Sequence, residues 1–249
     1  MLFDEAFLRK LEGLRLAARR AVNGRREGER LTRKRGGSSE FVSHRPYAQG
    51  DDLRAIDWNL YGRLGQLYVK EFAREEALPV RIAVDTTSSM APKFDYARRL
   101  AAALAMIANE ESPAVRLPDI EALTVGAPFA IPGTSRGLLI LVSDLWDDGL
   151  RAELMKSRCE KAVVHVLAPE EVDPPYAGKV RLVDAETGEA RTRFVGEDEK
   201  RDYARLLAEH CAAWKTWCFD REINYVRCAS STPLEEVVRV WLRESGVIE

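Results

Sequence analysis

The feature that most constrains the fold is a series of short, mainly apolar runs that alternate with helical patterns. Three such runs lie at residues 80–84, 137–143 and 162–167. Continuous apolar runs of this length are typical of strands that are covered on both faces, as in a parallel sheet. Because strands and helices alternate along the chain, the sequence predicts an α/β fold, a Rossmann-like open, mainly parallel sheet with helices on both faces.

The spacing of apolar residues places the other elements. Helices are expected at residues 4–22, 95–109, 150–161, 198–218 and 233–244, with a short helix at 53–58. Strands are expected at 67–72 and 224–228, and a weaker strand pattern lies at 122–131. Residues 180–183 and 192–195 alternate on either side of Glu186-Thr187-Gly188, which predicts a β-hairpin inserted in the C-terminal half.

Bulk composition excludes several classes of protein. A chain of 249 residues is long enough for one large domain or one domain with extensions. Its formal net charge of −2 produces no whole-chain field that would drive binding to nucleic acid or to an anionic membrane. No apolar run is long enough to span a bilayer, and the N-terminus lacks the pattern of a secretory signal. A cytoplasmic location is therefore predicted.

The cysteines do not indicate a redox or zinc site. Cys159, Cys211, Cys218 and Cys228 form no C-x-x-C pair, and the three histidines do not cluster with them. We expect reduced cysteines, mostly in the core. His165 lies inside an apolar run and is also expected to be buried rather than catalytic.

The first apolar run ends at Asp85, which opens a loop rich in hydroxyl groups. In an open α/β sheet, ligands bind beyond the carboxyl ends of the strands. Asp85 is followed by hydroxyls two and four residues later, at Thr87 and Ser89, and this pattern suits a hard divalent cation such as Mg²⁺ or Mn²⁺. The simpler alternative is that the serines and threonines cap the next helix.

Two enzymatic alternatives fit the residues poorly. A haloacid-dehalogenase-like phosphatase needs a second carboxylate two residues after the first, as general acid, and Thr87 occupies that position. Residues 133–137 match the G-x-S-x-G nucleophile elbow, but that motif requires a strand before it and a helix after it. Here the strand follows, so the context is inverted.

A third alternative is a nuclease-like acidic cluster of Asp85 with Asp144, Asp147 and Asp148. The simpler interpretation is that Asp147 or Asp148 caps the helix that begins near Leu150. We therefore expect a non-enzymatic binding module, and a magnesium-dependent phosphoesterase stays open as an alternative.

The N-terminal segment is strongly basic. Residues 9–35 contain eleven Lys or Arg and three Glu, a local excess of eight positive charges. This segment is either a solvated arm or a dock for phosphates or for an acidic protein surface. Nucleic-acid binding is the less favoured function, since no aromatic residues for base stacking are interleaved with the charges.

Residues 45–58 form a second dense motif. Gly50-Asp51-Asp52 predicts a turn in which Asp51 or Asp52 caps a short helix. The complementary charges predict that the acidic residues pair with Arg45 and Arg54. The full set expected to bind a partner or to hold the local structure is Arg45, Tyr47, Asp51, Asp52, Arg54, Asp57 and Trp58.

Together these motifs resemble the bacterial domain-of-unknown-function family numbered fifty-eight. The resemblance lies in residues 37–41, in the strings Arg45-Pro46-Tyr47, Gly50-Asp51-Asp52-Leu53-Arg54 and Ile56-Asp57-Trp58, in residues 85–90, and in Ser143-Asp144-Leu145 and residues 184–189. It covers nearly the whole chain. It implies a von Willebrand factor A-like fold at residues 79–249, preceded by an N-terminal extension at residues 1–78.

The resemblance also implies a partner and a site. Members of the family are commonly encoded beside MoxR-type AAA+ ATPases, which implies an adaptor or assembly partner of such an ATPase. The metal-dependent adhesion site of such folds would here use Asp85, Thr87, Ser89 and Asp144. Its middle loop should supply a threonine, but residues 111–136 are too few for the usual elements, and Thr124 and Thr134 are the only candidates. The sheet is therefore expected to be shortened in the middle.

Overall fold

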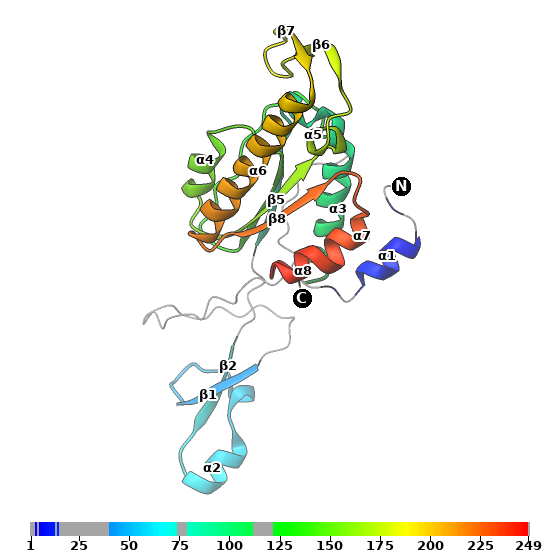
Figure 1. Ribbon diagram of the computed structural model, residues 1–249. Helices are drawn as coiled ribbons and strands as arrows, with labels where there is room; N and C mark the ends of the chain where they lie inside the picture. Colours follow the sequence, from blue (N-terminus) through cyan, green and yellow to red (C-terminus); the bar gives the residue numbers. More distant parts are fainter. Residues whose placement is uncertain are drawn as a thin grey trace. The chain divides into compact units, whose positions relative to one another are not determined.

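The computed structural model describes residues 3, 5–12, 14, 40–73, 79–111 and 122–248. The chain forms two compact units, one of residues Met1–Arg20 with Leu78–Glu249 and one of residues Ala21–Ala77 (Figure 1). Each unit contains its own β-sheet. The larger one is called the sheet unit below, and the smaller one the N-terminal unit.

The sheet unit is built on four parallel strands. In spatial order these are β3 (Val80–Val84), β4 (Leu138–Ser143), β5 (Glu160–Leu167) and β8 (Asn224–Ala229). Their register aligns Val84, Val142, Val164 and Val226 in one row across the sheet. The predicted open, parallel sheet is confirmed: the three apolar runs and the predicted strand at 224–228 are its four strands.

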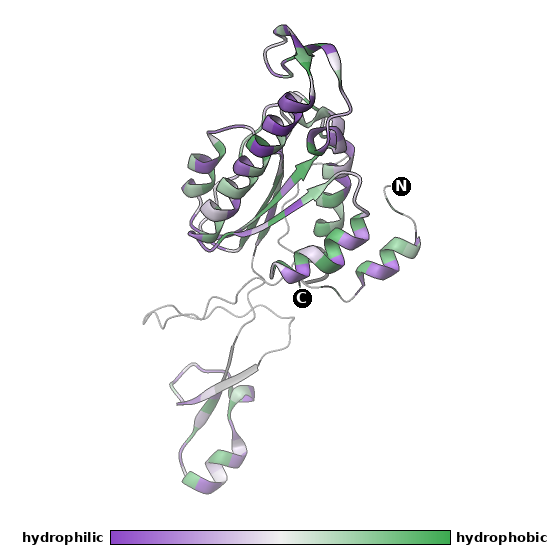
Figure 2. Ribbon diagram, in the orientation of Figure 1, coloured by the Kyte–Doolittle hydropathy of each residue, from purple (hydrophilic) through white to green (hydrophobic). Residues whose placement is uncertain are grey.

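Helices cover both faces of this sheet (Figure 1). One face carries α3 (Phe94–Glu111) and the C-terminal helical segment α7 (Leu234–Glu236), η3 (Val237–Trp241) and α8 (Leu242–Glu244). The other face carries α4 (Leu150–Lys156) and α6 (Glu197–Phe219). Alternate residues of each strand enter the two cores, since Ile140 packs in the first and Leu141 in the second. Figure 2 shows hydrophilic residues on the outer side of α6.

The first helix, α1 (Glu5–Leu11), belongs to the sheet unit. Phe3, Leu11 and Leu14 are buried in the core beside α3, and Lys10 Nζ lies 2.6 Å from Glu235 Oε2. The predicted helix at 4–22 is thus observed at 5–11, while residues 15–22 lie outside the described part of the chain. The sequence interpretation grouped α1 with an extension at 1–78, whereas its apolar side packs in the core of the sheet unit.

The predicted strand at 122–131 is wrong, because these residues form turns and irregular structure. Pro128 lacks the N–H that a strand needs, and Gly126 has a left-handed backbone (φ 81°). The segment instead contacts the end of β3, where Gly126 N donates to Thr86 O at 2.6 Å and Thr86 Oγ1 donates to Ala127 O at 2.8 Å.

Gly137 fixes the entry into β4. Its φ of 88° favours glycine, and a Cβ at this position would lie 1.9 Å from the carbonyl oxygen of Pro79. The G-x-S-x-G string therefore serves as a tight entry to a strand, as its inverted context indicated.

The N-terminal unit pairs β1 (Glu40–Pro46) antiparallel with β2 (Tyr68–Ala73). Strand β2 was predicted, whereas β1 was not, since its composition resembles a loop. The predicted helix at 53–58 is two helices, η1 (Leu53–Ala55) and α2 (Trp58–Leu64), because Asp52 caps the first and Asp57 caps the second.

The predicted hairpin is confirmed as β6 (Gly178–Val183) and β7 (Ala190–Val195), and it follows the short helix α5 (Pro169–Val172). The cysteines are free thiols, and three of them are buried, as expected. Burial raises the pKa of Cys218 and of Cys228 to about 12, so neither is a reactive thiolate near neutral pH. Among the described residues, no helix combines the length and hydrophobicity that crossing a membrane requires.

Candidate functional site

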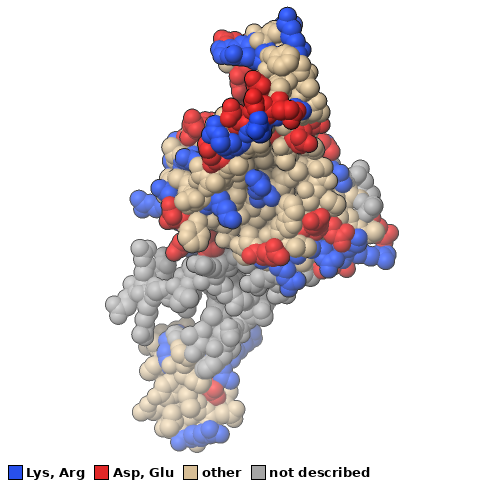
Figure 3. Space-filling view, viewed as in Figure 1, with Lys and Arg blue, Asp and Glu red and all other residues tan. Residues whose placement is uncertain are grey.

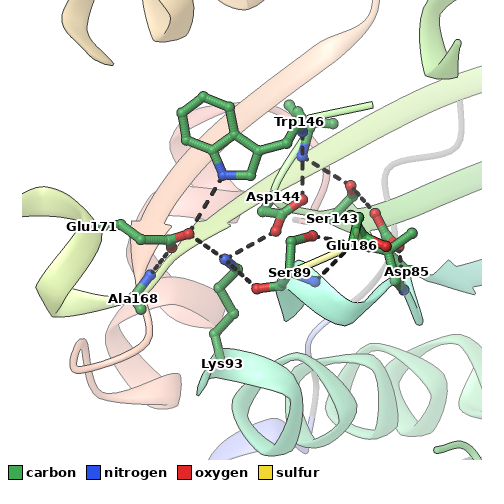
Figure 4. A network of polar contacts seen from close by, with 11 residues as sticks. Asp85, Ser89, Lys93, Ser143, Asp144, Trp146, Ala168, Glu171 and Glu186 are labelled. Atoms are coloured by element: carbon green, nitrogen blue, oxygen red, sulfur yellow. Dashed lines mark hydrogen bonds and ion pairs between the residues drawn. The ribbon is translucent and has the colours of Figure 1, made fainter. Parts of the chain in front are cut away.

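Asp85 lies at the carboxyl end of β3 and is 1% exposed. Its Oδ2 accepts a hydrogen bond from Ser143 Oγ at 2.5 Å, and its Oδ1 accepts from Thr87 N at 2.9 Å and from Thr87 Oγ1 at 2.7 Å (Figure 4). Asp85 therefore links the loops that follow β3 and β4, the two strands that meet at this edge of the sheet.

The hydroxyls of Thr87 and Ser89 face each other at the start of η2 (Ser88–Lys93), with 3.1 Å between their oxygens. Thr87 donates its proton to Asp85, so Ser89 is the donor in this second bond. Thr87 stands at the N-cap position of η2 but makes no side-chain cap bond. The alternative that this hydroxyl caps the next helix is therefore not what the structure shows.

The carboxyl end of β4 places Ser143, its last residue, and the following Asp144 in the same network, and both are buried. Leu145 follows in a left-handed conformation with φ 61°, which costs a residue with a Cβ about 1–2 kcal/mol. Two contacts hold it there, since Leu145 N donates to Ser143 Oγ at 3.0 Å and Trp214 Nε1 donates to Leu145 O at 3.2 Å.

Lys93 places a buried positive charge in this site, which the sequence analysis did not predict. Its side chain is 0% exposed, and its Nζ lies 2.9 Å from Asp144 Oδ2, 2.6 Å from Glu171 Oε1 and 3.0 Å from Ser89 O. Figure 4 shows this ammonium between the carboxylates of Asp144 and Glu171. A lysine is a compact positive charge, and a buried one needs opposite charges around it.

Glu171 comes from α5, just beyond β5. Its Oε2 accepts from Ala168 N at 2.6 Å, and its Oε1 also faces Trp146 Nε1 at 3.4 Å. The Trp146 ring stacks on His210 at 4.5 Å between centroids. Burial lowers the pKa of His210, and the nearby charge of Arg151 lowers it further.

His165 lies deeper in the sheet and is confirmed as a buried residue at 0% exposure. Its Nδ1 is 2.7 Å from Tyr225 Oη. Burial lowers its pKa to about 3, and the charges of His210 and Arg227 act in the same direction. The imidazole is therefore neutral near neutral pH.

The tip of the β6–β7 hairpin reaches the same site. Asp184 Oδ1 accepts from Glu186 N at 3.0 Å and from Thr187 N at 2.7 Å, which forms a rigid turn, and these bonds lower the pKa of Asp184. The turn presents Glu186, whose Oε1 accepts from Ser89 N at 2.9 Å. A residue 97 positions away in sequence thus places a carboxylate on the Thr87–Ser89 loop.

We call the residues Asp85, Thr87, Ser89, Lys93 and Asp144 the rim site. Its hydroxyl pair suits a dication, because two adjacent ligands of octahedral Mg²⁺ at 2.0–2.1 Å would lie about 2.9 Å apart. Asp144, however, is paired with the Lys93 ammonium, so the four predicted ligands do not form one open set. Among the described ranges, no group of three or more His, Cys, Asp or Glu has the geometry of a metal site. Metal binding stays a prediction.

The two candidates for the missing middle-loop threonine, Thr124 and Thr134, lie at opposite edges of the sheet. Thr134 precedes β4 and thus belongs to the opposite edge of the sheet, where its Oγ1 donates to Arg136 O at 2.8 Å. Thr124 lies in the turn beside Thr86, and its carbonyl accepts from Ala127 N. The predicted cap by Asp147 or Asp148 is not observed, because the N-cap of α4 is Gly149 without a side-chain cap bond. Asp147 Oδ1 instead accepts from Gly149 N at 2.7 Å, in the turn before the helix.

The motif at residues 45–58 forms a separate polar cluster within the N-terminal unit. Arg45 binds Asp51 through two bonds of 2.6 Å, and this guanidinium lowers the pKa of Asp51 to about 2. The hydrogen bond from His44, at 3.0 Å, is the main cause that lowers the pKa of Asp57 to about 2, and Lys70 lies 3.4 Å from the same carboxylate.

The other motif residues have varied environments. Arg54 donates its backbone N–H to Asp52 at 2.9 Å, and Tyr47 donates its backbone N–H to Leu67 O. Trp58 is 62% exposed and packs edge-on against Tyr61. The motif thus holds a turn through Arg45 and Asp51, as expected, while Asp57 pairs with His44 and Lys70 instead of an arginine.

Sequence analysis missed three residues of the site, namely Lys93, Glu171 and Glu186. A lysine at the start of an amphipathic helix is normally a surface residue, so Lys93 gave no signal of burial. Glu186 lies in the predicted hairpin turn, but its contact with Ser89, 97 residues away, is visible only in the folded structure. The basic arm at 9–35 lies mostly outside the described part of the chain.

The chain is similar to proteins of mycobacteria that are themselves described as uncharacterized. An uncharacterized protein of Mycobacterium bovis is 27% identical over 258 residues, which cover 84% of this chain and 80% of that protein. An uncharacterized protein of Mycobacterium tuberculosis matches with the same identity and coverage. One from Mycobacterium avium is 34% identical over 86 residues, 32% of this chain and 50% of that protein. No solved structure matches with comparable significance.

A family model described as protein of unknown function DUF58 matches residues 43–118 and 129–213. The match spans both the N-terminal motif and the rim site, and it confirms the resemblance drawn from those motifs. The chain therefore belongs to the DUF58 family of proteins of unknown function.

Proposed function

We propose that the chain is a non-enzymatic protein-binding module whose rim site receives an acidic side chain of a partner protein. The observation that supports this most directly is the carboxylate of Glu186, which accepts the N–H of Ser89 at 2.9 Å. The chain's own acidic side chain thus occupies the position that a partner's carboxylate would take. Hydrogen bonds to a charged acceptor are about twice as strong as neutral ones, so the contact is selective for an anion.

The hairpin beside the rim supports an acidic partner. Strands β6 and β7 carry Lys179, Arg181, Arg191 and Arg193 and no acidic residue. Figure 3 shows basic side chains at the hairpin and acidic side chains gathered below it, and the first turn of α6 carries Glu197, Asp198 and Glu199. Phe194 is 69% exposed and Val183 58%, so the hairpin also offers apolar area of the kind that protein interfaces bury.

The partner that we propose is a MoxR-type AAA+ ATPase, an inference that rests on the family resemblance. In the same inference the sheet unit is a von Willebrand factor A-like domain, and Mg²⁺ or Mn²⁺ at the rim is an optional addition. A cytoplasmic location would be consistent with such a partner. Nucleic-acid binding by the basic arm and phosphoesterase activity have no support in the described residues.

The direct test is binding between the full chain and a purified MoxR-type ATPase from the same genome, measured by calorimetry. Ser89→Pro removes the N–H that holds Glu186; this N–H lies in the first turn of η2, where it has no intrahelical acceptor to lose. We expect this variant to bind about tenfold more weakly or worse, as one charge-assisted hydrogen bond requires.

Ser89→Ala is the matched control, because it keeps the N–H and removes the hydroxyl. It should bind as the unmodified chain does if the N–H recognises the ligand, and it should lose affinity if the hydroxyl coordinates a metal. Absence of any binding to the ATPase, or equal binding by Ser89→Pro, would contradict the proposal.

A further inference from the structure

Lys93 has the contacts of a resident cation. An ammonium group has three N–H donors, and Lys93 Nζ has three oxygen neighbours, at 2.6, 2.9 and 3.0 Å. These oxygens come from three separate elements: the η2 turn, the loop after β4, and α5. The ammonium therefore connects the η2 turn and the loop after β4, which the predicted metal ion would also connect, and it adds α5 through Glu171.

Asp144 depends on this lysine for its counter-charge. The carboxylate is 1% exposed, and among the described residues its Oδ2 has no hydrogen-bond donor beyond the ion pair with Lys93. Ser89 connects the ammonium to the hydroxyl pair, since its carbonyl accepts from Lys93 and its hydroxyl faces Thr87. A dication on the hydroxyl pair would lie close to a buried positive charge that cannot move into water.

We propose that the Lys93 ammonium takes the place of a divalent cation at the rim site, so that the site works without metal. The positive charge neutralises Asp144 and Glu171 and fixes the Thr87–Ser89 loop. The anionic ligand is then held by the N–H of Ser89 and not by coordination. The role of Lys93 as the positive charge of the site does not depend on the proposed function. Only the statement of how an acidic ligand is held rests on that function.

Mn²⁺ is the probe that tests it, because the electron spin resonance signal of free Mn²⁺ disappears on binding. The unmodified chain should not bind Mn²⁺ at concentrations up to about 1 mM, the weak end of protein sites for hard cations. Lys93→Ala removes the charge and opens space beside Asp144. This variant should bind Mn²⁺ at least about tenfold more tightly than the limit of about 1 mM expected for the unmodified chain. Mn²⁺ should also raise the melting temperature of this variant alone.

Two variants make the gain specific. Lys93→Ala/Asp144→Asn should lose the acquired Mn²⁺ binding, because a neutral amide then replaces the carboxylate that had paired with Lys93. Lys156→Ala, which removes an exposed lysine paired with Glu153 on α4, should bind no Mn²⁺. If Lys93→Ala does not fold without metal, Lys93→Ala/Glu171→Ala relieves part of the excess negative charge and should show the same gain.

Mn²⁺ binding by the unmodified chain that is lost in Asp85→Asn would overturn the inference, as would a Lys93→Ala protein that binds no better than the original. Binding of the ATPase by the unmodified chain should persist in a metal chelator. If it is lost there, the inference fails while the proposed function stands. If the ATPase never binds, the proposed function fails, and the Mn²⁺ titrations still decide the role of Lys93.

Discussion

The rim site and the Arg45–Asp51 turn use the same chemistry in opposite environments. Lys93 and Asp144 have side chains that are 0% and 1% exposed, whereas Arg45 and Asp51 are 40% and 18% exposed. Exposed ion pairs contribute little to stability, because water already solvates both charges. A buried charge that loses its partner has no such alternative. Each buried charge of the rim therefore needs its partner for stability, whereas the Arg45–Asp51 pair mainly fixes the shape of its turn and adds little to the free energy of unfolding.

The largest effect should come from breaking the buried pair. Asp144→Ala leaves the Lys93 ammonium with one carboxylate that is only partly buried, and we expect a loss of about 3–5 kcal/mol in the free energy of unfolding, measured in urea. Lys93→Met/Asp144→Leu removes both charges together and should recover most of that loss. A cost below about 1 kcal/mol for the single variant would mean that the rim behaves like an exposed pair.

His165 should give a pH dependence that no exposed group can imitate. Its pKa in the folded chain is about 3, below the ordinary value of 6.5, so only the unfolded chain gains a proton between these values. The stability that its burial provides is therefore complete above pH 6.5 and is lost as the pH falls. The slope is about 1.4 kcal/mol per pH unit, or about 2 kcal/mol between pH 6.5 and pH 5.

Urea unfolding at several pH values measures this slope. His165→Gln cannot be protonated at this position and should reduce the slope over the window, leaving the contribution of His210, whose pKa burial also lowers. Its stability at pH 7 will fall from lost packing with Tyr225. An unchanged slope in His165→Gln would assign the acid sensitivity to other groups. The carboxylates Asp51 and Asp57 titrate lower, with pKa values of about 2, so their contribution falls below pH 4.

These two regions also show how far sequence reasoning extends. The four parallel strands and the loop with Asp85, Thr87 and Ser89 follow from local patterns, since apolar runs and turn residues report burial along one strand. The antiparallel strand β1 does not follow from them. The burial of Lys93 does not follow from local patterns, because it depends on Asp144 and Glu171, which lie far from Lys93 in the sequence. Local pairing such as Arg45 with Asp51, six residues apart, was within reach of sequence analysis.

The displaceable contact at the rim predicts a smaller effect than the buried charges. If Glu186 competes with a partner's carboxylate, Glu186→Ala should raise the affinity for the ATPase by a factor equal to the reciprocal of the fraction of sites that Glu186 leaves free. Calorimetry should show a gain of a few-fold, on the order of 1 kcal/mol. Glu189→Ala, on the same turn but paired with Arg191, is the matched control and should change nothing. A lower affinity for Glu186→Ala would mean that Glu186 supports the loop and does not compete.

The smallest effect on stability should come from the exposed turn, and there the pKa is the sharper readout. Arg45→Gln removes the guanidinium that is the main cause of the low pKa of Asp51, so that pKa should rise from about 2 toward its ordinary value of 3.8. NMR titration of the Asp51 carboxyl carbon measures this directly. Urea unfolding near pH 7 should change little, since solvent screens both charges. If Arg45→Gln destabilised the chain as strongly as Asp144→Ala, burial would not be what separates the two clusters. The tight turn at Asp51 would then be an essential part of the fold, because its backbone bond to Ala48 would fail with the arginine.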